Sequence, residues 1–465
     1  MKVEHKIRHR RRDVLGAVCL SMATSLTIFA GTSASAQQSA SPYAPSQSPP
    51  VGQMPSIPAP LTGAGPVAQI VQFGNSIGKS LADEGIYLSG SYTEDIAGMV
   101  SGGVPGKTGV GPSGQFSVGA VFDLQRMLGL TGGSLHVTFD ERSGFSLNNN
   151  TGNSAGLTEG GVGPTRAARL SELYYEQAFY DDRIDIQVGR TNPTLNFATS
   201  DLGISCSTVG APLCAQPASW YFSNESVAFP ASTWGGFLNV QTTPHTYFRT
   251  GAYDDDISQL NPNQQGFNFN VKGSDGVFLP AEIGYQTDLS DARYPAKYDI
   301  GGYWDDANYT TPNGIPMRGR TAYYAQAEKT VWRPDPNKNQ SIALFAGGII
   351  YTGGAPYWSQ FDAGIYDRAP FGNARPDDTI TIVASRFANA QNQQPNAPSM
   401  WFYEVDYNFA VVPGLTVEPF IDYIVAPNNL LDGFSAREPK NALTLGFQVS
   451  IDLAHFFGLP QFVAY

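Results

Sequence analysis

The chain has 465 residues, of which 28 are basic and 40 are acidic, and its formal net charge is −12. Charged residues make up only 15% of the chain and aromatic residues 12%, with 50 glycines. The acidic balance argues against nucleic acid as a partner, because phosphate binding is driven by Lys and Arg.

The first 36 residues have the features of a secretory signal peptide. A basic start at residues 6–12 leads into an apolar stretch at 14–30 and a small-residue cleavage site, Ala34-Ser35-Ala36. Without this segment the basic residues fall from 28 to 22 and the acidic ones from 40 to 38, so the mature chain carries about −16. The sequence therefore predicts an exported protein.

Residues 37–66 are rich in Ser, Pro, Gln, Ala and Gly, a composition that predicts a flexible lead. Residues 67–84 show loose helical spacing and predict a short helix. No later apolar run approaches the roughly 20 residues that a membrane helix needs. From residue 85 to 465 the period changes to two, so this part of the chain is expected to be built of strands.

The alternation is clearest at 443–451, where Leu443, Leu445 and Phe447 alternate with polar or small residues. Such a strand has one apolar and one polar face. Sixteen segments of this kind are expected, near 86–98, 113–123, 133–142, 168–179, 183–190, 233–241, 246–253, 276–286, 297–304, 321–331, 340–351, 358–368, 378–388, 399–409, 414–425 and 441–452.

The links between these segments alternate in length. Even-numbered links are short, whereas most odd-numbered links are longer, with about 25 residues at 143–167 and about 42 at 191–232. Short turns at one end and long loops at the other are typical of outer-membrane barrels. The sequence thus predicts an all-β fold, a transmembrane antiparallel β-barrel of about 16 strands with a short N-terminal helical lead. A soluble β-sandwich is the alternative.

Four stretches have a recognisable family pattern. They are Leu81-Ala82-Asp83-Glu84-Gly85-Ile86, Asp123 to Leu130, Leu170 to Gln177, and Gly189-Arg190-Thr191-Asn192-Pro193. They resemble the carbohydrate-selective porin family of the glucose-porin (OprB) type. The resemblance implies a barrel for passive diffusion of small sugars, with long loops that fold inward and narrow the pore. The chain departs from the usual barrel ending, because residues 454–461 follow the last clean strand before Phe462.

Charged residues at inward positions are the first candidates for sugar contacts. If Leu135, Val137 and Phe139 face lipid, Asp140 and Arg142 face the lumen, and the same parity turns Glu172, Glu176 and Arg249 inward. A basic side chain on the lipid side would cost about 2–4 kcal/mol at mid-bilayer. The alternative is that these residues are general lumen wall, without a role in selectivity.

The loop after residue 190 is the expected constriction. Arg190 shares parity with lipid-facing positions, but it ends its strand and opens the longest loop, which contains Asn192 and Trp220. Cys206 and Cys214 lie eight residues apart in an exported chain and are expected to form a disulfide in this loop. The alternative is a surface loop that the disulfide merely stabilises.

We therefore expect an outer-membrane porin whose partners are small sugars and lipid, in a homotrimer by analogy with porins generally. No cofactor, metal site or catalytic activity is expected. The alternatives are a secreted β-rich carbohydrate-active enzyme and a non-transporting structural barrel. Glu172 and Glu176 do not suit a glycosidase, because four residues along one strand separate their backbones by about 13 Å.

Overall fold

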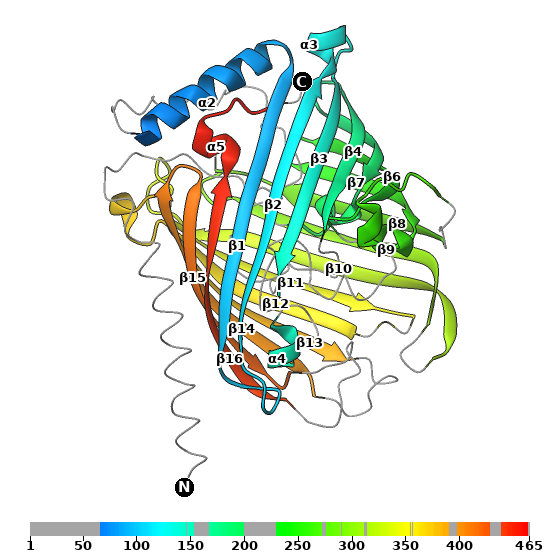
Figure 1. Ribbon diagram of the computed structural model, residues 1–465, viewed down its shortest axis with the longest axis vertical. Coiled ribbons are helices and arrows are strands. Elements are labelled where there is room, and N and C mark those ends of the chain that lie inside the picture. The colour runs from blue at the N-terminus through cyan, green and yellow to red at the C-terminus, as the bar shows by residue number, and fades with distance from the viewer. Residues whose placement is uncertain are drawn as a thin grey trace.

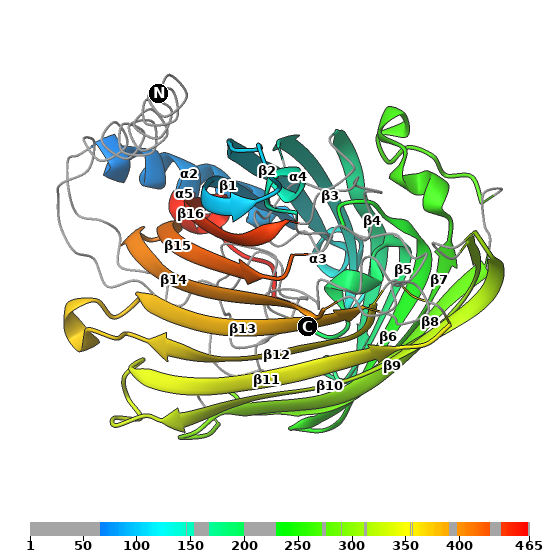
Figure 2. The same cartoon turned by 90° about the horizontal axis from the view of Figure 1, so that it is seen from below.

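Sixteen antiparallel strands form one closed barrel in the computed structural model, in which each strand pairs with its sequence neighbours and β1 pairs with β16 (Figure 2). The structure describes residues 66–145, 147–152, 167–199, 229–271, 276–289, 291–310, 314–353, 355, 357–389, 398–427 and 439–463.

The strands are β1 (Ile86–Gly103), β2 (Val110–Asp123), β3 (Gly133–Gly144), β4 (Ala168–Phe179), β5 (Ile184–Thr191), β6 (Thr233–Thr243), β7 (Thr246–Asp255), β8 (Gly276–Gln286), β9 (Ala296–Thr310), β10 (Pro316–Trp332), β11 (Ser341–Tyr351), β12 (Tyr357–Arg368), β13 (Thr379–Asn389), β14 (Met400–Val412), β15 (Leu415–Val425) and β16 (Lys440–Asp452). The α-helices are α2 (Pro66–Asp83), α3 (Leu124–Leu128), α4 (Asn148–Thr151) and α5 (Leu453–Phe457). Short 3-10 turns, η1 (Pro193–Leu195), η3 (Ile257–Leu260), η4 (Pro262–Gln264) and η5 (Gly372–Ala374), lie in the connections.

Each of the sixteen predicted segments corresponds to one strand, so the fold class and strand number are confirmed. The main differences are at the ends with the long links, where β1, β9 and β10 run five or six residues beyond the prediction. There the ladder between β9 and β10 continues to Pro316↔Thr310. Backbone pairing extends these strands past the point at which their side-chain alternation weakens.

Side chains sort by parity into an outer apolar and an inner polar face. On β14, Trp401, Tyr403 and Val405 are about 40% exposed, whereas the alternating Glu404 and Asp406 are buried inside the ring. The outward residues are apolar because they face lipid hydrocarbon, and the inward ones are polar because they line the lumen. The register across β1 and β16, with Asp95 opposite Gln448, continues this sorting through the seam that closes the barrel.

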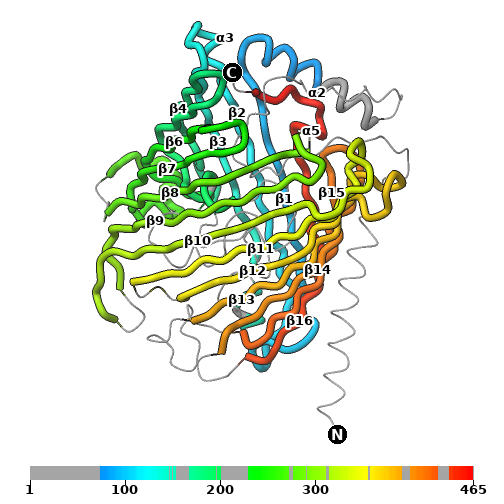
Figure 3. Tube along the Cα trace, turned by 180° about the vertical axis from the view of Figure 1, so that it is seen from behind, coloured from blue at the N-terminus to red at the C-terminus, as the bar shows by residue number. Residues whose placement is uncertain are grey.

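Helices α2, α3 and α5 lie at one end of the barrel, the end with the short turns (Figures 1 and 3). Among the described residues, no helix is both long and apolar enough to cross a membrane. The last strand ends at Asp452, so residues 453–463 are an added segment and not barrel wall.

This C-terminal segment, residues 453–463, packs against α2 and returns to the barrel mouth. A Cβ added to Gly78 of α2 would lie 2.8 Å from the Leu459 side chain, so the two pieces are in close contact. Phe462 then contacts the rings of Tyr87 and His136 edge-on, at centroid distances of 5.4 and 6.1 Å. Phe462 therefore lies at the mouth of the barrel and does not end the last strand.

Candidate lumen and constriction site

Asp140 and Arg142 share the lumen face of β3, as their parity predicts. Asp140 is buried and accepts hydrogen bonds from Ser117 and, at 3.4 Å, from the Gln115 amide. Arg142 is half-buried, its Nε donates to Gln115 Oε1 at 2.6 Å, and its guanidinium lies 5.7 Å from the Phe229 ring. Gln115 therefore connects the two charged side chains through its two ends.

Glu172 and Glu176 lie on the lumen face of β4, where each has a separate partner. Thr138 Oγ1 donates to Glu172 at 3.0 Å, and Glu176 Oε2 lies 2.6 Å from His136 Nε2. The His136 ring also stacks on Tyr174 at 4.6 Å. Ser134 Oγ lies 2.9 Å from the same Nε2 atom. A serine-histidine-acid triad needs its hydroxyl and carboxylate on opposite ring nitrogens, so this group has a different arrangement.

Arg190 and Asn192 bind loop backbone and neither faces the lumen. Arg190 is fully buried, and its Nη2 donates to the Ser232 carbonyl at 2.7 Å and to Gln259 Oε1 at 3.1 Å. The β4–β5 ladder ends at the pair of Arg190 with Leu173, and beyond that point the Leu170 N–H donates to the Gln265 carbonyl at 3.0 Å. Asn192 Oδ1 accepts the Thr194 N–H and caps η1.

The chain beyond η1 folds into the lumen. We call residues 196–199 the inner segment, because side chains from four neighbouring strands bind its backbone. Ala198 N–H donates to Glu282 Oε2 at 2.8 Å, and Arg249 Nη1 lies 3.5 Å from the Asn196 carbonyl oxygen. The Thr199 carbonyl accepts from Lys297 Nζ and from Gln326 Nε2. We call these four side chains, Arg249 on β7, Glu282 on β8, Lys297 on β9 and Gln326 on β10, the anchor wall.

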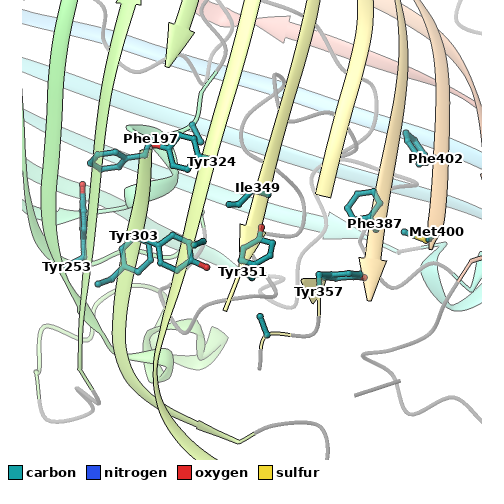
Figure 4. Close-up of a cluster of buried hydrophobic side chains, with 14 of the residues drawn as sticks. Phe197, Tyr253, Tyr303, Tyr324, Ile349, Tyr351, Tyr357, Phe387, Met400 and Phe402 are labelled. Carbon is teal, nitrogen blue, oxygen red and sulfur yellow. The ribbon is translucent and has the colours of Figure 1, made fainter. Parts of the chain in front are cut away.

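Apolar contacts join the inner segment to the same side of the barrel. Phe197 is fully buried and meets the Phe237 ring edge-on at 5.6 Å. It belongs to a cluster of inward-facing aromatic and aliphatic side chains (Figure 4) that includes Tyr253, Tyr303 and Tyr324. Burial of Phe197 removes its ring from water and stabilises the inward position of the segment.

Carboxyl side chains line the opposite side of the lumen. We call Asp95 of β1, Glu404 and Asp406 of β14, and Glu418 and Asp422 of β15 the acidic wall; all five are at most 2% exposed. Gln448 donates to Asp95 at 2.8 Å, and Thr444 donates to Asp422 at 2.7 Å. Among the described residues of β13–β16 and β1, the basic side chains are Arg386 on the outward face and exposed Lys440 at a strand end.

Sequence reasoning named Arg249 but missed Glu282, Lys297 and Gln326. The signal was present, since each alternates with outward apolar neighbours such as Ile283, Tyr298 and Ala325. Trp220, Cys206 and Cys214 lie outside the described residues. Within the described ranges, no group of three or more His, Cys, Asp or Glu side chains could hold a metal ion.

Comparison with known proteins identifies relatives of this architecture. The family model "Carbohydrate-selective porin, OprB family" matches residues 107–453. Porin B of Pseudomonas aeruginosa is 23% identical over 412 residues, covering 79% of this chain and 88% of that protein. The high-pH structure of Pseudomonas putida OprB superposes with a TM-score of 0.70 at 22% identity, over 81% of this chain and 96% of that one. The low-pH structure of the same porin gives 0.52 at 18% identity, over 81% and 95%. The two solved structures support the fold, and the family match covers most of the barrel.

Proposed function

This chain belongs to the carbohydrate-selective porin (OprB) family and is an outer-membrane porin, and from that premise we propose that small sugars diffuse passively through its lumen past the inner segment. The observation that carries the proposal is the position of residues 196–199 inside the barrel, bound to the anchor wall. An inward segment narrows a lumen that sixteen strands would otherwise leave wide. Polar groups around it can exchange hydrogen bonds with sugar hydroxyls.

Within this proposal the charged residues fall into two roles. Half-buried Arg142 and Glu172 contact the passing sugar, with Asp140, Glu176 and Arg249 as the supporting charges behind them. Arg190 and Asn192 act on the constriction through the loop backbone that they bind. We further propose that Trp220 completes the constriction and that a Cys206–Cys214 disulfide stiffens it.

We also propose that residues 1–36 are removed on export and that the mature porin forms a homotrimer in the outer membrane. Export requires the basic start and apolar stretch of a signal peptide, which these residues have. N-terminal sequencing of protein from outer-membrane fractions tests the first point, since a start at Gln37 is expected. Cross-linking in detergent tests the second, and a band only at monomer size would contradict the trimer.

A secreted carbohydrate-active enzyme is the competing function. It is disfavoured by the family match. Release of reducing sugar from oligosaccharides by the purified protein would support the enzyme reading instead.

The deciding experiment is single-channel recording of the mature protein in planar bilayers, titrated with glucose and with a disaccharide. We expect stable conductance steps that sugar blocks in part at millimolar concentration. Steps without sugar block would leave a porin without a sugar site. No steps from folded protein would contradict the channel itself.

A further inference from the structure

We propose that Glu282, Lys297 and Gln326 are positioning residues of this channel, which hold the inner segment against one wall and thereby set the largest sugar that passes. The inference rests on the proposed sugar diffusion and adds to it the residues that fix the size limit. All three side chains are buried on the lumen face of β8, β9 and β10, with exposed fractions of 1%, 2% and 7%.

Glu282 is the centre of the arrangement. Its Oε2 accepts two hydrogen bonds, from Ala198 N–H at 2.8 Å and from the Tyr324 hydroxyl at 2.7 Å. Its Oε1 faces Arg249 Nη1 at 3.4 Å, and Arg249 in turn stacks on the Tyr247 ring at 4.2 Å. A carboxylate held by three donors from two strands and the inner segment has a fixed orientation, so the Ala198 N–H has a fixed acceptor.

Lys297 and Gln326 bind the carbonyl of Thr199, the residue that follows Ala198 in the inner segment. Lys297 Nζ and Gln326 Nε2 both donate to Thr199, and Gln326 Nε2 also lies 3.2 Å from Asp299 Oδ2. The wall therefore binds an N–H and a carbonyl of two consecutive residues. Backbone recognition of this kind fixes where the segment lies whatever its side chains are, because each bonded group belongs to the main chain.

Phe197 adds an apolar contact to the polar ones, so the inner segment is held both by its backbone and by a buried ring. Its ring is buried in the aromatic cluster (Figure 4). The backbone on either side is hydrogen-bonded to the anchor wall, through the Asn196 carbonyl and the Ala198 N–H. Loss of the polar anchors would leave the Ala198 N–H without its acceptor and the Thr199 carbonyl without its donors, which destabilises the docked position of the segment. The segment would then leave the wall and widen the lumen.

The test compares Glu282→Ala with Glu418→Ala in the full mature chain. Glu418 is the matched control, because it is also a lumen-facing glutamate at 1% exposure, but it lies on the acidic wall and accepts a hydrogen bond from Asn408 of the adjacent strand β14. We measure single-channel conductance, open-channel noise, and liposome swelling with mono-, di- and trisaccharides. Heat-modifiable migration on gels shows that each variant is folded.

Glu282→Ala is expected to raise conductance about twofold or more and to shift the size limit by one sugar unit, whereas Glu418→Ala leaves the size limit unchanged. Glu282→Gln should restore the wild-type limit, because the Ala198 and Tyr324 donors share one oxygen that an amide also provides. Lys297→Met gives an independent readout if Glu282→Ala does not fold. Equal size limits in wild type, Glu282→Ala and Lys297→Met would overturn the positioning role.

The controls also separate this inference from the proposed function. A wild-type protein that conducts and is blocked by glucose, with variants of unchanged size limit, contradicts only the positioning role. A wild-type protein that forms no channel contradicts the proposed function itself. No rescue by Glu282→Gln would indicate that the carboxylate charge, and not the hydrogen bonds to the segment, controls permeation, and would also overturn the proposal.

Discussion

The anchor wall and the acidic wall lie on opposite sides of one lumen, and they differ in the partners of their charged side chains. On the anchor side, acids and bases lie together, as in Arg249–Glu282 at 3.4 Å and Lys297–Asp299 at 3.9 Å. On the acidic side, carboxylates are held by amides and hydroxyls of neighbouring strands. The difference shows that strands of the same alternating pattern can build two kinds of lumen wall, since one side binds the chain's own backbone and the other gathers carboxyl side chains.

The largest effect is expected from removal of the ring that docks the inner segment. Phe197→Ala should weaken docking by about 3–5 kcal/mol, the usual cost of truncating a buried phenylalanine, and should raise open-channel noise. Limited proteolysis is the second measurement, and cleavage near residue 197 should accelerate in the variant.

Phe420→Ala is the matched control for this change. Phe420 is 2% exposed, faces the lumen beside the acidic wall, and packs in a separate cluster with Ala97 and Leu147. It should lower barrel stability without raising noise or cleavage near residue 197. Equal behaviour of the two variants would remove the distinction between the walls.

Ion selectivity is the next test, because it depends on whether the carboxyl side chains of the acidic wall attract cations. Wild type should prefer cations, and Asp406→Asn with Glu418→Gln should lower the cation preference about fivefold, as about 1 kcal/mol of attraction is lost at close approach. Reversal potentials across a KCl gradient measure this ratio. The effect should shrink at 1 M salt, where screening is short-ranged. An anion-preferring wild type would contradict the role given to the acidic wall.

A smaller effect is expected where α2 packs against residues 453–463, a contact that belongs to neither wall. Gly78→Val should displace the C-terminal segment, because its Cβ would lie 2.8 Å from Leu459 and 2.9 Å from Pro460. Overpacking of this kind costs about 1–3 kcal/mol. Faster proteolysis after residue 457 is the expected readout, with unchanged ion selectivity. Unaltered cleavage would mean that the segment is not held by α2.

The smallest effect should come from a single sugar contact. Arg142→Gln is expected to weaken glucose block about two- to tenfold, as loss of one net hydrogen bond of about 0.5–1.5 kcal/mol implies. Neighbouring Glu141 is exposed on the outer face, so Glu141→Gln should leave the block unchanged. A drop in block for Glu141→Gln as large as for Arg142→Gln would show that general charge, and not contact, decides affinity.

The number of strands, their approximate positions and the inward or outward direction of most of their side chains were predictable from the sequence, whereas the extended ends of β1, β9 and β10 were not. Period-two alternation is a local property, and lipid imposes it on every strand of a barrel, so it can be read without knowledge of neighbours. For the same reason Asp140, Arg142, Glu172, Glu176 and Arg249 were assigned to the lumen correctly by parity.

The roles of Arg190 and Glu282 could be decided only by the tertiary structure. Arg190 opens the long loop, as expected, but its guanidinium donates to the carbonyls of Ser232 and Asn268, on two separate loops. Glu282 sits in an ordinary alternating strand, and only the fold brings it to Ala198, 84 residues earlier. The inner segment meets Lys297 and Gln326 across 98 and 127 residues. Alternation states which face a residue occupies, whereas contacts across such separations depend on how the barrel closes around its own loop.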